Sequence, residues 1–233
     1  VQDKLTFIAD PILDPISYGF TKSIERYIYL REKYPDIHIM IGIGNITELT
    51  HADTSGINMI MLGIVEELKL NHILTTQVSR HCSTVIRETD LARRIIHAAS
   101  ENNITPKHIN NGLLINHGHK DYAYTSDELS DMKSNIKDKN YRIYVNDDGV
   151  HLFNKTIYKV FSDPYDFYEF LEVDEDSGHS FYLGVELARA QIAYQLRKEY
   201  SQDEELDWGC LIDKKADNKL QSKELGPTFK KRK

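Results

Sequence analysis

The feature of this sequence that most limits its fold is a strand pattern followed by a helix pattern, repeated three times in the first hundred residues. Short apolar runs with strand character occupy residues 5–9, 37–43 and 72–76. Segments with helical spacing of apolar residues follow them, at residues 21–33, 55–69 and 90–101. Three successive β-α units predict a parallel sheet with right-handed crossover connections.

A parallel sheet of only three strands cannot bury both of its faces. The chain after residue 101 does not continue the pattern, because residues 102–140 are polar and are interrupted by Pro106, Gly112 and Gly118. We therefore expect an α/β fold in which residues 1–110 are the C-terminal part of a (β/α)8 TIM-type barrel. Val1 is not a methionine and a strand pattern begins almost at once, so we expect the chain to be a fragment of a longer protein.

The second half of the chain predicts a small α+β domain over residues 140–212, reached through a connecting segment at 111–139 with one short helix at 127–136. Strand patterns flank Asn146-Asp-Asp-Gly149, which is typical of a hairpin turn. Asp163-Pro164 predicts a helix start, and the longest helix is expected at 181–200. Four tyrosines with helical spacing are expected in the core of this domain: Tyr165, Tyr168, Tyr182 and Tyr194.

Charge and composition exclude several classes of protein. The net charge of −7 divides into +5 over residues 213–233, expected to be a basic flexible tail, and −12 over the remainder, which argues against nucleic-acid binding. No apolar run is long enough to span a membrane, so we expect a cytoplasmic protein. Cys82 and Cys210 are too few for a disulfide scaffold or a four-thiolate zinc site. His117 and His119 lack a third ligand nearby, so no metal site is expected.

Candidate binding residues follow the predicted strands, because ligands gather at the C-terminal ends of parallel strands. The carboxylate of Asp10 could accept hydrogen bonds from the N–H groups of a planar heterocycle, and Asn45 could both donate and accept along the same edge. The alternative is that both are turn residues, Asp10 before a proline and Asn45 after a glycine. The residues alone leave both interpretations open.

The order of these residues resembles a known family. Several short stretches carry the likeness: Asp10-Pro11, Gly19-Phe-Thr-Lys22, Gly44-Asn-Ile-Thr-Glu-Leu-Thr50, Ala52-Asp53 with Gly56-Ile-Asn58, and Leu74-Thr-Thr76. They resemble the pterin-binding barrels of dihydropteroate synthases and of corrinoid-linked methyltetrahydrofolate methyltransferases. The likeness is greatest to archaeal dihydropteroate synthase-related proteins associated with tetrahydromethanopterin metabolism. Residues from Asn140 to Asp203 resemble the uncharacterised domain attached to that group.

The resemblance implies particular binding residues. Pterin contacts would come from Asp10, Lys22 and Asn45, with Gly19 and Gly44 shaping the loops that carry them. Three residues after the third strand, Gln77, Ser79 and Arg80, are the candidates for an anionic substrate. No catalytic residue can be assigned. Dihydropteroate synthases carry Ser-Arg-Lys where this chain has Asn45, which instead resembles the pterin-contacting asparagine of the methyltransferases.

What the resemblance implies about activity is a transferase that joins a hydroxymethyl-dihydropterin diphosphate to an arylamine. The reduced pterin would be a substrate, no cofactor would be tightly bound, and Mg²⁺ would enter through the missing N-terminal half of the barrel in the same parent chain. These 233 residues alone would be inactive. Two other functions remain open: a pterin-to-corrinoid methyltransferase and a non-catalytic pterin-binding module. A homodimer is also open as the oligomeric state.

Overall fold

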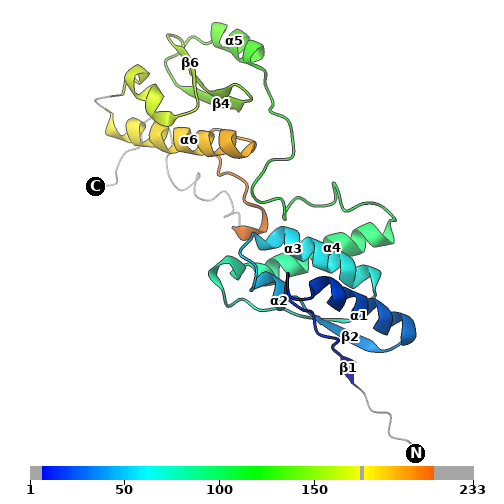
Figure 1. The fold of residues 1–233 in the computed structure, drawn as a ribbon. Coiled ribbons are helices and arrows are strands. Elements are labelled where there is room, and N and C mark those ends of the chain that lie inside the picture. The colour runs from blue at the N-terminus through cyan, green and yellow to red at the C-terminus, as the bar shows by residue number, and fades with distance from the viewer. Residues whose placement is uncertain (1–6, 174–175, 213–233) are drawn as a thin grey trace, which may run out of the picture. The chain divides into compact units, whose positions relative to one another are not determined.

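A computed structural model describes residues 7–173 and 176–212 of the chain. These residues form two compact units, each with its own sheet (Figure 1). Among the described residues, unit 1 comprises 7–113 and 209–211, and unit 2 comprises 114–173, 176–208 and Ile212. The expected basic tail, at 213–233, lies outside the described residues, as does the beginning of the first expected strand.

Unit 1 alternates strands with helices. Its elements are β1 (Ile8–Ala9), α1 (Phe20–Lys33), β2 (His38–Gly42), α2 (Gly44–Thr47), α3 (Thr54–Glu67), β3 (His72–Leu74), the 3₁₀-helix η1 (Arg80–Cys82), α4 (Val85–Glu101) and the 3₁₀-helix η3 (Gly209–Leu211). The strands form one parallel sheet in the order β1-β2-β3, so the predicted parallel sheet of three β-α units is confirmed. The described strands do not close into a barrel.

The helices of unit 1 start and stop where local chemistry directs them. Gly19, with a φ of 115°, precedes α1, and this left-handed conformation suits glycine. Pro35 follows α1 closely. The predicted start of α4 at residue 90 was wrong, because the helix begins at Val85. Its first turns bury Glu88 and Thr89, two polar residues that interrupt the apolar spacing.

Among the described residues, helices cover only one face of the parallel sheet. Ile39 and Ile41 of β2 have no exposed surface and pack in the core with residues of α1, α3 and α4. Side chains alternate between the faces of a strand, so His38, Met40 and their paired neighbours point to the other side. On that side Ile8 is 50 % exposed and Leu74 is 53 % exposed. We call this side the bare face.

Unit 2 is built around an antiparallel sheet. Its elements are α5 (Ser126–Ser134), β4 (Arg142–Asn146), β5 (Gly149–Phe153), β6 (Tyr158–Phe161), the 3₁₀-helix η2 (Pro164–Phe170) and α6 (Ser177–Leu196). The strands form a meander in the order β4-β5-β6, and the predicted hairpin is confirmed as β4-β5. Arg197 adopts a left-handed conformation, with a φ of 51°, and ends α6 before the predicted residue 200.

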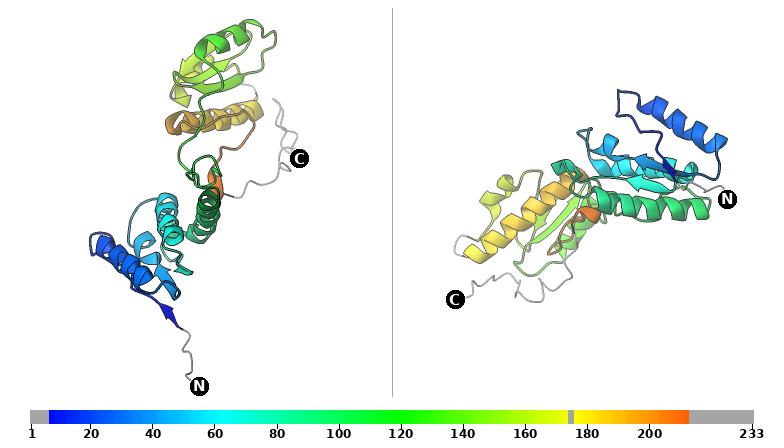
Figure 2. Two further views of the ribbon diagram at one scale, coloured as in Figure 1. Left: turned by 90° about the vertical axis from the view of Figure 1, so that its right-hand side faces the viewer. Right: turned by 90° about the horizontal axis from the view of Figure 1, so that it is seen from below.

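Both faces of the unit 2 sheet are covered. Ile143 and Leu152 pack against α6 on one face, and α5 lies on the opposite side of the sheet (Figure 2). His151 and Phe153 point away from α6 and are nevertheless fully buried. Residues 114–139, expected as a connecting segment, therefore belong to unit 2 and help to close it. The buried Leu129 on α5 is too isolated in the sequence to reveal this.

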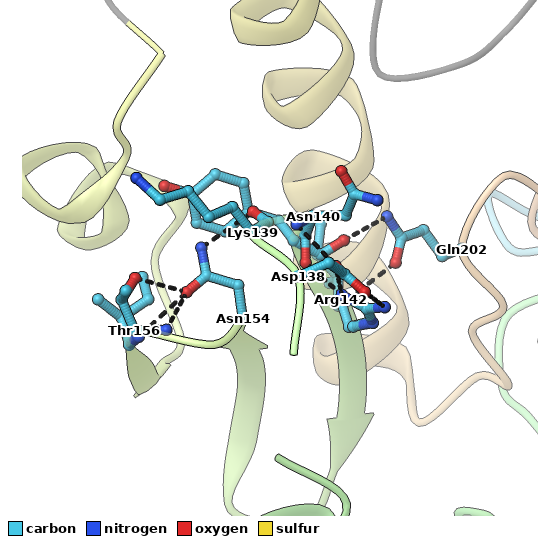
Figure 3. A network of polar contacts seen from close by, with 10 residues as sticks. Asp138, Lys139, Asn140, Arg142, Asn154, Thr156 and Gln202 are labelled. Atoms are coloured by element: carbon cyan, nitrogen blue, oxygen red, sulfur yellow. Dashed lines mark hydrogen bonds and ion pairs between the residues drawn. The ribbon is translucent and has the colours of Figure 1, made fainter. Parts of the chain in front are cut away.

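A polar network determines the turn into β6, a strand that the sequence analysis missed (Figure 3). The Oδ1 atom of Asn154 accepts hydrogen bonds from the backbone N–H and hydroxyl of Thr156 and from the N–H of Ile157, at 2.8, 2.8 and 3.1 Å. Its Nδ2 atom donates to the carbonyl of Lys139 at 3.1 Å. One asparagine thus shapes the turn and ties it to the segment before β4.

The same network protects the outer edge of β4 (Figure 3). Gln202 accepts a hydrogen bond from the N–H of Ile143 at 3.0 Å and donates to the carbonyl of Tyr141 at 3.3 Å. Arg142 pairs with both carboxylate oxygens of Asp138, at 2.5 and 2.8 Å. A side chain therefore takes the place of a further strand beside β4.

The tyrosine prediction was half wrong. Tyr182 and Tyr194 are partly buried against the unit 2 core, as expected. Tyr165 and Tyr168 are 87 % and 73 % exposed, because η2 is a 3₁₀-helix with three residues per turn and Phe167 takes the inward position. In the described part of the chain, no helix is long and apolar enough to span a membrane.

Candidate functional site

The loops that follow the three parallel strands meet at one edge of the unit 1 sheet. Asn45 at the start of α2 donates a hydrogen bond from Nδ2 to the carbonyl of Leu13, in the loop after β1, at 2.7 Å. Glu48 reaches the loop after β3, where its carboxylate accepts from the hydroxyl of Thr76 at 3.0 Å. Direct contacts therefore join each loop to its neighbour, and we call this edge the rim.

Asp10 lies at the rim directly after β1. Its Oδ1 atom accepts a hydrogen bond from the N–H of Ile12 at 2.9 Å and from the hydroxyl of Tyr27 at 3.3 Å. Tyr27 is fully buried, and burial together with the nearby Asp10 raises the pKa of its hydroxyl. Asp10 itself is exposed, and no described hydrogen bond engages its Oδ2 atom. One carboxylate oxygen thus shapes the turn and the other remains available.

Arg26 holds the loop after β1 in place, a role that the sequence analysis missed. Its guanidinium donates to the carbonyls of Pro11 and Ile12 at 3.0 and 2.6 Å and pairs with the carboxylate of Asp14 at 2.7 Å. The signal in the sequence is its position on α1, four residues after Lys22 and on the same helix face.

Two glycines let the rim loops approach closely. A Cβ atom on Gly44 would lie 3.1 Å from the hydroxyl oxygen of Thr76, and one on Gly19 would lie 3.1 Å from Oδ2 of Asp14. Gly44 therefore lets the loop after β3 sit against α2, and Gly19 lets the loop after β1 turn into α1.

Glu48 fixes the segment that carries the predicted anion-binding residues. Besides Thr76, its carboxylate accepts from the backbone N–H groups of Val78 and Ser79, each at 2.8 Å. These donors, with Val78 foremost, lower the pKa of Glu48 to about 2. Glu48 belongs to the stretch Gly44–Thr50, and nothing in that stretch indicates this role.

The three candidates for anion binding are placed differently. Ser79 donates its backbone N–H to Glu48 at 2.8 Å, and its hydroxyl also bonds that carboxylate and helps to lower the pKa of Glu48. The amide of Gln77 donates to the carbonyl of Ser83 at 2.7 Å. Arg80 is exposed, and no described ion pair engages its guanidinium. Arg80 is therefore the one of the three whose side chain remains available.

Lys22 lies in a pocket on the outer side of β1. The pocket is open, has a volume of about 820 Å³, and is lined by Asp10, Arg26 and Tyr29 among others. The Nζ atom of Lys22 pairs with the carboxylate of Glu25 at 2.8 Å on the same helix. Asp10 and Lys22 thus share this pocket, whereas Asn45 does not line it.

Neither a known protein family nor a solved structure matches the chain. The chain is similar to an uncharacterized protein of the archaeon Methanocaldococcus jannaschii. The two are 30 % identical over 85 % of this chain and 42 % of that protein. The chain thus spans less than half the length of the relative that it matches.

A buried carboxyl group, that of Glu88, connects the helices that begin near the rim, and it was not predicted from the sequence. Glu88 on α4 is 1 % exposed and accepts hydrogen bonds from Thr54 at 2.6 Å, Asn58 at 2.9 Å and Thr84 at 2.7 Å. Thr54 begins α3, and Thr84 directly precedes α4. Glu88 therefore fixes the starts of two helices that point towards the rim.

The rim also contains a buried hydroxyl without a partner. Among the described residues, the Oγ1 atom of Thr75, directly after β3, makes no hydrogen bond. With Oδ2 of Asp10 and Oδ1 of Asn45, one unused polar atom follows each of the three strands. The oxygens of Asp10 and Asn45 are of the kind that orient a small polar ligand, whereas the Thr75 hydroxyl is buried beneath the surface.

Histidines and acidic residues do not form a metal site in the part of the chain that the structure describes. The Nδ1 atom of His117 contacts the carbonyl of Leu196 at 3.3 Å. A Cβ atom on Gly118 would lie 2.1 Å from the carbonyl oxygen of Arg197. The His-Gly-His stretch therefore packs closely against the end of α6, and the glycine permits that approach.

Proposed function

We propose that unit 1 is the C-terminal part of a pterin-binding (β/α)8 barrel of the dihydropteroate synthase-related type. The observation that carries the proposal is the bare face, together with a rim at which Asp10 and Asn45 each keep one oxygen that no described hydrogen bond engages. Parallel sheets occur almost only with both faces covered, and a closed barrel covers the inner face with its other strands. Five further β-α units would complete it.

The rim chemistry suits a flat nitrogen heterocycle. The free oxygen of Asp10 would accept hydrogen bonds from the ring N–H and exocyclic amine of a pterin. Asn45 lies outside the pocket that Asp10 lines, so its amide oxygen would accept a hydrogen bond only from a ligand that extends from that pocket across the rim. Arg80 would attract the negative charge of a diphosphate or of a second substrate. Lys22 would contribute in the same way after leaving Glu25.

The reaction that we propose joins a hydroxymethyl-dihydropterin diphosphate to an arylamine. The amine nitrogen attacks the methylene carbon, the carbon–oxygen bond to diphosphate breaks, and the amine loses a proton to water. The protein would contribute mainly by holding the two substrates in line. Mg²⁺, if used, would be held by the preceding units. We place the activity in the cytoplasm, in the synthesis of a folate-type or tetrahydromethanopterin-type cofactor.

The test is calorimetric titration of a dihydropterin into protein that includes the preceding β-α units. Asp10→Asn keeps the oxygen that Ile12 requires but removes the charge. Affinity should fall about tenfold to a hundredfold, as for loss of a hydrogen bond to a charged group. Asp36→Asn, an exposed aspartate just before β2 at the other end of the sheet, should leave affinity unchanged. Unchanged affinity in Asp10→Asn would remove Asp10 from the site, and no binding by the wild type would refute the proposal.

A second function is a methyl transfer between a reduced pterin and a corrinoid. Asn45 favours it, because the synthase lysine is absent there and the Oδ1 atom of Asn45 is unused. A change in the corrinoid absorption spectrum on mixing with a methyl-pterin would select this function over the synthase. Binding without either reaction would leave a non-catalytic pterin-binding module.

A further inference from the structure

The 3₁₀-helix η2 of unit 2 presents two exposed rows of side chains with complementary chemistry. Three residues make one turn of such a helix, so every third residue faces the same way. The acidic row consists of Asp163, Asp166 and Glu169. The tyrosine row consists of Tyr165 and Tyr168. The third row, which faces inwards, consists of Pro164, Phe167 and Phe170. We call the first two rows the acidic–tyrosine face.

The acidic–tyrosine face has no partner among the described residues. Tyr165 and Tyr168 are 87 % and 73 % exposed, and the carboxylates of Asp166 and Glu169 are exposed without an ion pair in the described part of the chain. Large aromatic side chains, tyrosine among them, are typical anchors of binding surfaces. This face therefore has the composition of a binding surface.

The neighbouring surface already shows how this chemistry holds a lysine. The Nζ atom of Lys159 lies 3.9 Å from the centre of the Phe170 ring, at the end of η2. Two residues after Phe170, the carboxylate of Glu172 pairs with Lys139 at 3.5 Å. Cation–π contact and ion pairing with carboxylates are therefore both in use beside the acidic–tyrosine face.

The same chain contains a segment of matching chemistry. Residues 213–233 carry eight lysines or arginines and three acidic residues, and four of the cations are consecutive, at 230–233. The segment begins five residues after Trp208, which belongs to unit 2. The Nζ atom of Lys198 lies 4.7 Å from the centre of the Trp208 ring. The reach of the segment when extended is about 70 Å. A unit of about 100 residues has a radius of gyration of only about 13 Å.

We propose that the acidic–tyrosine face binds the cationic segment 213–233 of the same chain. Lysines of the run 230–233 pair with Asp166 and Glu169, and their aliphatic and ammonium groups lie on the rings of Tyr165 and Tyr168. Binding of this kind weakens with salt, because the charges are exposed. The proposal does not depend on the pterin site, which lies in unit 1.

The test is zero-length carbodiimide cross-linking of the whole chain, followed by peptide mass spectrometry. An equal mixture of ¹⁴N- and ¹⁵N-labelled protein separates links within one chain from links between chains. We expect links from lysines 230, 231 or 233 to Asp166 or Glu169 within one chain. Their yield should fall several-fold at about 1 M salt, where the screening length is about 3 Å.

Matched variants test whether binding requires the acidic–tyrosine face or only exposed acidic residues in general. Tyr165→Ser together with Tyr168→Ser keeps both carboxylates and should lower the yield of these links by about fivefold, the equivalent of two weak cation–π contacts. Asp131→Asn, an exposed carboxylate on α5 of the same unit, should leave the yield unchanged. The proposal is overturned by links distributed evenly over acidic residues, by links only between chains, or by a yield that the tyrosine substitutions do not change.

Discussion

The two sheets of this molecule differ in how they are covered. The antiparallel sheet of unit 2 has α6 on one face and α5 with its flanking residues on the other, so Phe153 and His151 are fully buried. The described helices of unit 1 cover one face of its parallel sheet, and Leu74 is 53 % exposed on the other. A similar number of strands thus forms a closed core in one unit and an open half in the other.

The difference follows from how the strands are connected. Hairpins leave the chain free to place a helix on either side of an antiparallel sheet. Right-handed crossovers between successive parallel strands place every helix on the same side. Unit 2 can therefore complete itself with a short helix, whereas unit 1 needs additional strands or another surface against its bare face.

The largest expected effect on stability comes from truncating a large apolar side chain on a covered face of the unit 2 sheet, compared with one on the bare face of unit 1. Phe153→Ala should lower the free energy of unfolding of unit 2 by about 3–5 kcal/mol, because it leaves a cavity in a buried face. Leu74→Ala on the bare face should cost unit 1 less than about 0.5 kcal/mol. Urea unfolding followed by fluorescence of the single tryptophan, Trp208, reports unit 2. Hydrogen exchange in α3 and α4 reports unit 1.

A cost above about 2 kcal/mol for Leu74→Ala would break the comparison, since fully buried apolar side chains behave in that way. In protein that includes the proposed preceding units, the same substitution should become costly. That change would sharpen the comparison by showing what covers the bare face.

The next effect concerns the covered side of unit 1. Glu88→Ala should destabilise unit 1 by about 2–4 kcal/mol, because Thr54, Asn58 and Thr84 lose a buried acceptor. Asp90→Ala on the same helix removes only exposed ion pairs with Arg93 and Arg94, so it should cost less than about 1 kcal/mol. Hydrogen exchange in α3 and α4 measures both.

The Trp208 transition of unit 2 should be unchanged by Glu88→Ala. If it moved as far as the unit 1 signal, the two units would unfold together, and the comparison between them would have to be abandoned. Equal effects of Glu88→Ala and Asp90→Ala would instead show that the buried carboxyl group has no special structural role.

The smallest effect distinguishes the units by pH. In unit 2, burial lowers the pKa of His151, whose ring contacts Oδ1 of Asn146 at 2.6 Å and the hydroxyl of Tyr158 at 2.9 Å. The neutral ring is stabilised by folding, so its contribution is fully present above about pH 6.5 and is lost as the pH falls through the folded pKa. In unit 1, Glu48 has a pKa of about 2 against an ordinary 4.5, so its contribution is lost only between those values.

Urea midpoints measured at a series of pH values test this order. The Trp208 midpoint should fall as the pH drops below about 6.5, and His151→Gln should flatten that fall. Glu48→Gln should flatten only the acid loss of unit 1 below pH 4.5. A His151→Gln profile parallel to the wild type would show that other groups cause the acid sensitivity of unit 2.

Regular patterns in the sequence predicted much of the fold. Apolar spacing located α1, α3 and α6 to within a few residues, and the Asp-Gly pair located the β4-β5 hairpin. The placement of Asp10 and Asn45 after parallel strands followed from the same rule. These features depend on neighbouring residues, which a sequence displays directly.

The rest depends on contacts between distant residues. The acceptor for Thr54 and Asn58 is Glu88, thirty or more positions away, and nothing in its own surroundings marks it as buried. Tyr165 and Tyr168 fit a helical pattern, but Phe167 between them takes the inward position of η2, so both tyrosines face outwards. The bare face was foreseeable only as a count of strands, since no single residue on it signals exposure.

The return of the chain to unit 1 has a consequence for how the molecule can be taken apart. The N–H of Cys210 donates to the carbonyl of Gly112 at 2.7 Å, so the points where the chain leaves unit 1 and comes back lie side by side. Residues 114–208 of unit 2 thus form a stretch of chain whose two ends meet, and Ile212, after the short return, belongs to unit 2 again. A single proteolytic cut in a loop between residues 114 and 208 would leave the two fragments joined, because this contact and the unit 2 core both connect them.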